Sequence, residues 1–139
     1  MPDNVTELRA KTSDTEKVTI NLGYVDLGLI DLLVAEKFYS NRTDFIRTAI
    51  RNQLERHADA TRQSASRKSL ELGLRVLTRR ELEDVQAEGR LLHLRVLGLA
   101  TIADDVSPAL ALATIGSIEV LGALHASTAV KAALAGRLS

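Results

Sequence analysis

A short stretch near the amino terminus alternates strictly between polar and apolar residues, and it constrains the fold more than any other feature. It is the hexapeptide KVTINL, residues 17–22. A period of two predicts a strand with one buried face. We expect Val18, Ile20 and Leu22 on the buried face, and Lys17, Thr19 and Asn21 on the exposed one. Because no second strand follows at hairpin distance, the simplest pairing partner is the same strand of a second chain.

Two helices are predicted directly after this strand. The first, about Val25 to Lys37, has apolar residues around most of its circumference, so it must be buried nearly all round. A unit of this size cannot bury such a helix alone, which again implies a dimer. The second helix runs from about Arg42 to His57, with Ser40 or Asn41 as its N-cap and Asp44 in its first turn.

The run KVTINL…DLLVAEKFYSNRTDFIRTAIRNQLE, within residues 17–57, resembles the ribbon-helix-helix repressors of the CopG, MetJ and Arc group. Its most specific part is YSNRTDFIR, residues 39–47, followed by Ala49 and Ile50. The resemblance implies an intertwined homodimer whose two strands pair antiparallel and enter the major groove of double-stranded DNA. It also implies three base-reading residues, Lys17, Thr19 and Asn21, and a phosphate anchor made of Ser40, Asn41 and Arg42. One departure is Gly23 at the strand–helix junction, where members of the family often have proline.

The side-chain chemistry at these positions fits DNA recognition. Lysine can donate to guanine, asparagine can pair with adenine, and the threonine methyl group can pack on thymine. The N-terminus of a helix offers free N–H groups and partial positive charge to a phosphate. The expected dimer core consists of Val18, Ile20, Leu22, Ile30, Leu33, Phe45, Ile46, Ala49 and Ile50.

The C-terminal half contains an internal sequence repeat. The segment LRVLGL, residues 94–99, recurs as IEVLGA, residues 118–123, and a fainter copy, LELGL, occupies residues 70–74. Helical-turn segments follow the copies at residues 78–82, 106–110 and 130–134. A regular spacing of this kind predicts a short β/α solenoid-like unit that resembles leucine-rich repeats in period and shape, with an ordinary compact α/β unit as the alternative. The glycines are expected to mark the ends of the strands.

The two ends of such a repeat unit would expose strand edges and apolar surface. Residues 130–139 are expected either to form a capping helix or to leave the last repeat open for self-association. In the second case the unit would promote oligomerisation beyond the dimer. The alternative is a folded appendage that stabilises the dimer.

Together these features predict an α+β chain of four segments. They are a polar tail at 1–16, a ribbon-helix-helix DNA-binding domain at 17–57, a linker at 58–69 and the repeat unit at 70–139. Lys+Arg and Asp+Glu number 18 each, so a DNA-binding surface must come from local placement rather than from net charge. The chain has no cysteine, and no apolar run reaches about 18 residues, so thiolate metal sites and a membrane span are not expected.

Catalytic chemistry finds no support in the sequence. His57, His93 and His125 have no second ligand at metal spacing, and Asp104–Asp105 is expected in a loop without a catalytic partner. Phosphate-binding loops and nucleophile elbows are absent. We therefore expect no enzyme, no cofactor and no metal. The expected protein is a cytoplasmic, nucleoid-associated transcriptional regulator that acts as a repressor; the alternatives are an antitoxin that binds a toxin protein, and a DNA-coating scaffold or plasmid-partition protein.

Overall fold

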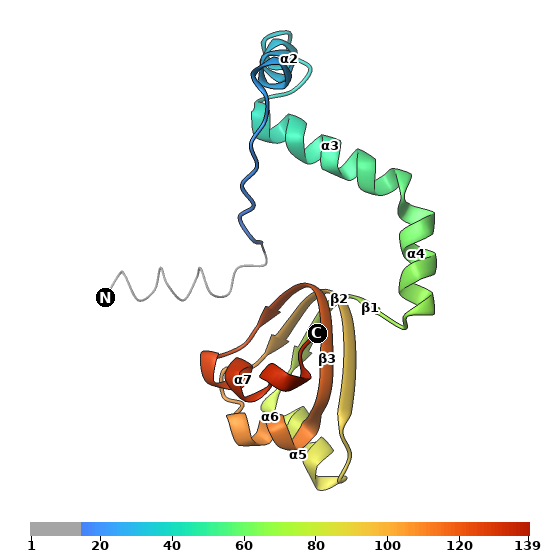
Figure 1. The fold of residues 1–139 in the computed structure, drawn as a ribbon, viewed down its shortest axis with the longest axis vertical. Coiled ribbons are helices and arrows are strands. Elements are labelled where there is room, and N and C mark those ends of the chain that lie inside the picture. The colour runs from blue at the N-terminus through green and yellow to red at the C-terminus, as the bar shows by residue number, and fades with distance from the viewer. Residues whose placement is uncertain (1–14) are drawn as a thin grey trace, which may run out of the picture. The chain divides into compact units, whose positions relative to one another are not determined.

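The computed structural model describes residues 15–139 (Figure 1). The described chain divides into two compact units, one from Thr15 to Ser64 and the other from Ala65 to Ser139. The polar tail predicted at 1–16 therefore lies outside the described residues, apart from its last two positions. Each unit is considered by itself below.

The first unit contains α2 (Tyr24–Ala35) and α3 (Arg42–Arg56), which were both predicted within one or two residues at most ends. The chain leaves α2 at Lys37, whose φ of 70° is left-handed and stops the helix. Of the two expected N-caps, Ser40 and Asn41, helix α3 begins at Asn41, whose side chain accepts a hydrogen bond from the Asp44 N–H at 2.8 Å. The prediction of the second helix and of its cap is confirmed.

Residues 15–23 precede α2 without belonging to any helix or strand. The strand predicted at 17–22 has no pairing partner among residues 15–139, and a strand is defined by its ladder of hydrogen bonds. The single chain thus leaves this segment exposed, with Val18 at 78% and Ile20 at 61% of their full accessibility.

The first unit buries little of its own apolar surface. Ile30 is the single buried hydrophobic residue described between Thr15 and Ser64. Of the expected dimer core, Leu33, Phe45 and Ile46 are half-buried, whereas Val18, Ile20, Leu22, Ala49 and Ile50 are exposed. Two helices and an extended segment cannot enclose an apolar core alone, so the single chain leaves this surface open.

A third helix, α4 (Ala58–Arg67), occupies the segment that was expected to be a linker. The small, polar composition is typical of a linker, but alanine, arginine and glutamine all have high helix propensity. The helix begins directly after His57, whose carbonyl accepts from the Thr61 N–H at 2.9 Å. The linker expected at 58–69 is therefore helical over most of its length.

The second unit alternates strands with short helices. Its elements are β1 (Glu71–Leu77), α5 (Arg79–Ala87), β2 (Leu92–Ile102), α6 (Pro108–Thr114), β3 (Ile115–His125), α7 (Thr128–Ala133) and the 3₁₀ turn η1 (Ala135–Arg137). The three strands form one parallel sheet in the order β1-β2-β3. Figure 1 shows the helices together within the curve of the sheet. The core between them includes Leu77, Leu82, Val96, Ile102, Ile115, Ile118 and Leu134.

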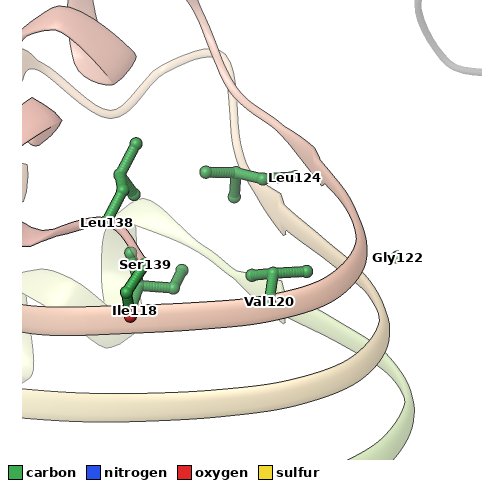
Figure 2. Close-up of a pocket in the computed structure, with 6 residues that line it drawn as sticks. All are labelled: Ile118, Val120, Gly122, Leu124, Leu138 and Ser139. Carbon is green, nitrogen blue, oxygen red and sulfur yellow. The ribbon is translucent and has the colours of Figure 1, made fainter.

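The strand register pairs equivalent positions of the predicted repeats. Gly73 pairs with Gly98, and Gly98 pairs with Gly122. All three glycines have positive φ, at 116°, 141° and 125°. The strands run through them, so the expectation that the glycines end the strands was wrong. They bend the strands instead, as Figure 2 shows for β3 at Gly122.

The last residues of the chain lie along the outer edge of β3. Leu138 bridges Ile118 in parallel, and the Ser139 N–H donates to the Ile118 carbonyl at 3.0 Å. Arg137 fixes this path, because its guanidinium donates to the carbonyl oxygens of Leu112 and Ile115 at 2.6 and 2.8 Å. The capping helix considered for residues 130–139 therefore ends early, and an extended segment follows it.

An apolar groove of about 200 Å³ lies between this segment and β3 (Figure 2). Ile118, Val120 and Leu124 line it from the strand, and Leu138 closes it from the chain end. The groove thus belongs to the edge that the C-terminal residues partly cover.

Candidate nucleic-acid interface

The three predicted base-reading residues, Lys17, Thr19 and Asn21, lie on the exposed segment before α2. Lys17 makes no ion pair within the part of the chain that the structure describes. All three side chains are thus available to a ligand, although the single chain does not pair the segment into a ribbon.

The predicted phosphate anchor lies at the N-terminus of α3. The Ser40 N–H donates to the Asp44 carboxylate at 2.9 Å, and the Asp44 N–H is taken by Asn41. The first helical hydrogen bond runs from Phe45 N–H to the Asn41 carbonyl, so the amides of Arg42 and Thr43 come before it. These two amides are the groups that the helix leaves for an anion.

The side chain of Arg42 is bound to another helix. Its guanidinium donates both Nε and Nη2 to the Asp31 carboxylate of α2, each at 2.8 Å. This hydrogen bond lowers the pKa of Asp31 and raises that of Arg42. The pair joins α2 to α3 in the single chain, so the guanidinium of the expected anchor residue Arg42 is already engaged by a carboxylate.

The comparisons with known proteins identify the family. A model of the ribbon-helix-helix transcriptional regulator family matches residues 13–131, most of the chain. The chain belongs to the ribbon-helix-helix transcriptional regulator family. No curated protein and no solved structure matches it.

The match gives the chain a place among transcription regulators that bind DNA, a family of regulators rather than of enzymes. It also extends from the first unit through most of the second, up to Lys131 in α7. The repeat-containing unit is therefore part of what this ribbon-helix-helix family shares.

The structure adds two contacts that the sequence did not single out. Tyr39 and Phe45 meet edge to face, with ring centroids 5.1 Å apart, and so hold the turn against the start of α3. Asp31 lies within the helix that the sequence predicts to be buried nearly all round, yet its carboxylate binds Arg42, 11 residues further along the chain. The sequence did carry a signal for this pair, namely a carboxylate within a mainly apolar helix and an arginine at the start of the next helix.

Other polar groups in this ribbon-helix-helix protein are engaged locally. His93 shares a hydrogen bond with Ser117 at 2.9 Å on neighbouring strands, and Asp104 and Asp105 lie in a turn after β2. Among residues 15–139 no group of three or more His, Asp or Glu side chains is arranged to hold a metal ion. The same residues contain no helix long and apolar enough to cross a membrane.

Proposed function

We propose that this regulator binds DNA as a homodimer whose two 17–22 segments pair antiparallel and read the major groove. The observation that supports it most is the exposure of Val18, Ile20 and the apolar faces of α2 and α3 in the single chain. A second chain would cover this surface and pair the unpaired segment in one step. At about 25 cal/mol per Å², burial of such aliphatic side chains is the main source of association energy.

In this dimer Lys17, Thr19 and Asn21 face the base edges, and the amides of Arg42 and Thr43 in each chain hold a backbone phosphate. Phosphate contacts position the protein, and base contacts give sequence preference. We propose a repressor with a short, symmetric operator, because an isologous dimer binds two equivalent half-sites.

The repeats of the second unit, residues 70–139, are proposed to form a short solenoid that serves assembly of the regulator. Its support is the in-register repeat of strand and helix and the aliphatic surface on its first strand. Stacked repeats of this kind share one core and leave their terminal strands as contact surfaces.

The deciding experiment is binding of the full chain to DNA from upstream of its own gene, with unrelated DNA for comparison. We expect tight binding to the first DNA only, and loss of that binding in the Lys17→Ala/Thr19→Ala/Asn21→Ala variant. Thr19→Ala and Asn21→Ala alone should each change preference at single base positions by about 1–3 kcal/mol.

The control is Thr128→Ala/Lys131→Ala, which removes one threonine and one lysine from α7 and should bind like the parent protein. Equal affinity for both DNAs would contradict sequence reading and favour a DNA-coating role. Absence of binding at low salt would contradict the proposal altogether.

A further inference from the structure

The first strand of the second unit has an open edge. Strand β1 pairs with β2 on one side, and no described strand lies on its other side. Its outward residues are aliphatic and well exposed, with Leu72 at 83%, Leu74 at 73% and Val76 at 50%. Natural proteins usually protect such an edge with charges, proline or a bulge, because it presents unpaired N–H and C=O groups. The edge is therefore suited to accept another strand.

The backbone alternation shows which groups face outward. The carbonyl oxygens of Gly73 and Leu77 face β2, since the first lies against Gly98 and the second accepts from the Ala103 N–H at 3.0 Å. Backbone groups of successive residues in a strand point to opposite sides. The N–H and C=O groups of Leu72, Leu74 and Val76 thus belong to the free edge.

The opposite edge of the sheet is not equally open. Ser139 already hydrogen bonds along β3, since it donates to Ile118 and accepts from Val120, and Leu138 bridges Ile118. A head-to-tail stack, with β1 of one chain on β3 of the next, would have to displace them. Pairing of β1 with β1 requires no displacement, and such an isologous contact closes on itself instead of growing into a fibre.

The sequence of β1 is complementary to itself when it is reversed about Gly73. An antiparallel pair centred there places Glu71 opposite Arg75, Leu72 opposite Leu74, and Gly73 opposite its own copy. Within one chain Glu71 lies 3.7 Å from Arg75, whose guanidinium is held more closely by Glu81 at 2.6 Å. The Glu71 carboxylate therefore has capacity for a second cation, and opposite charges facing each other across two strands are stabilising.

We propose that the free edge of β1 pairs antiparallel with β1 of a second copy of this chain, centred on Gly73, to give a six-stranded sheet. This inference rests on the proposed function, because the ribbon dimer supplies a tethered second copy. Tethering raises the effective concentration, so a contact as small as one strand pair is sufficient. In the paired sheet the exposed leucines of the two chains cover one another.

Disulfide trapping tests the pairing and its register in the full chain, which has no cysteine of its own. Leu72→Cys and Leu74→Cys are placed on two differently tagged chains that are co-expressed. Residues directly opposite in a hydrogen-bonded antiparallel pair have Cα atoms about 5.5 Å apart, within the range of a disulfide. We expect a mixed disulfide between the two tags, and much less cross-linking when either variant is present alone.

Leu91→Cys co-expressed with Leu72→Cys is the control, since Leu91 is similarly exposed but lies before β2. Glu71→Arg in the trapping pair should reduce the mixed disulfide about fivefold by facing Arg75 of the other chain. Glu83→Arg, a charge change of the same kind on α5, should leave it unchanged. Strong cross-linking of Leu74→Cys alone, or absence of the mixed disulfide, overturns the proposal.

The test separates this inference from the proposed function. The Lys17→Ala/Thr19→Ala/Asn21→Ala variant should lose DNA binding and keep the mixed disulfide. A chain that binds its operator but gives no mixed disulfide would overturn the edge pairing and leave the DNA-binding proposal intact.

Discussion

Two glycines in the second unit lie so close to the backbone of the neighbouring strand that they have no room for a side chain. A Cβ on Gly98 would clash with the Gly73 carbonyl oxygen, and one on Gly122 would clash with that of Gly98. Their positive φ values add strain for any residue with a Cβ. Gly73 has the same backbone conformation but nothing close to it. Alanine substitutions at these positions therefore distinguish the free-energy cost of the positive φ from the cost of the steric clash.

Replacement of Gly98 by alanine should lower the free energy of unfolding by at least about 2 kcal/mol, because strain and collision add. Gly73→Ala should cost about 1–2 kcal/mol, from conformation alone. Gly136→Ala is the control, since a Cβ there meets nothing and its φ is not left-handed. Urea denaturation of the full-length variants measures all three. Equal losses at Gly73 and Gly98 would contradict the close approach of the strands.

The Asp31–Arg42 pair gives the first unit a pH dependence. Its hydrogen bond holds the pKa of Asp31 below the ordinary value of 3.8. The stabilisation is therefore complete above that value and is lost as the pH falls through the lower, folded-state pKa. Asp31→Asn should lower the thermal midpoint at pH 7 and have little effect at strongly acidic pH.

Thermal scans from pH 7 down to pH 2 follow this difference. Arg42→Gln should give the same loss at pH 7, and the double variant should lose no more than either single one, because both remove one interaction. A difference that persists unchanged at the acid end would show that Asp31 stabilises α2 in another way.

At the scale of elements, the strands of the second unit lead into helices in a repeated manner. Thr78, Ser107 and Ser127 each cap the following helix by accepting a hydrogen bond from the N–H three residues on. Helices α6 and α7 span 7 and 6 residues, too few to be stable by themselves. Their caps and their packing on the sheet therefore carry most of their stability.

Ser107→Ala should cost about 1 kcal/mol, through loss of the bond to the Leu110 N–H at 3.1 Å. Ser107→Asp should keep most of the stability, because a carboxylate also caps. The urea midpoint of the second unit is the measurement. A Ser107→Asp variant as unstable as Ser107→Ala would argue against the capping role.

How far the elements could be predicted depended on whether their signals were local. Asn41 and Asp44 marked the start of α3 within four residues, and the period of the repeats placed all three strands. Helix α4 was missed because helix propensity without an apolar stripe looks like a polar linker. The strands were predicted too short because a glycine in a strand usually signals a break, whereas here neighbouring carbonyl oxygens require it. The partner of Arg42 depends on how two helices meet, which no local pattern records.

At the scale of the whole molecule, charge is balanced in both units. Residues 15–64 carry 7 Lys+Arg and 7 Asp+Glu, and residues 65–139 carry 9 and 8, so their net charges are 0 and +1. Long-range attraction to DNA is therefore weak, and affinity has to come from close contacts. Each cation at the interface should then account for a visible share of the salt dependence.

Lys17→Ala should make the plot of log K against log salt shallower by about 2, one contact for each chain of the proposed dimer. Lys131→Ala, on α7 of the other unit, should leave the slope unchanged. Fluorescence anisotropy with labelled operator DNA at several salt concentrations measures both. An unaltered slope for Lys17→Ala would place this lysine away from the DNA.

The alignment of Gly73, Gly98 and Gly122 across the sheet also limits how the second unit can gain or lose repeats. Each strand fits against its neighbour because a residue without a side chain lies at the same level in all three. A duplicated segment that spans one interval from glycine to glycine would bring its own glycine to that level and could be inserted between existing repeats. An inserted repeat without a glycine at that level would place a side chain against a carbonyl oxygen. Relatives that differ by whole repeats should thus be viable, and the spacing of Gly73, Gly98 and Gly122 is the measure by which to recognise them.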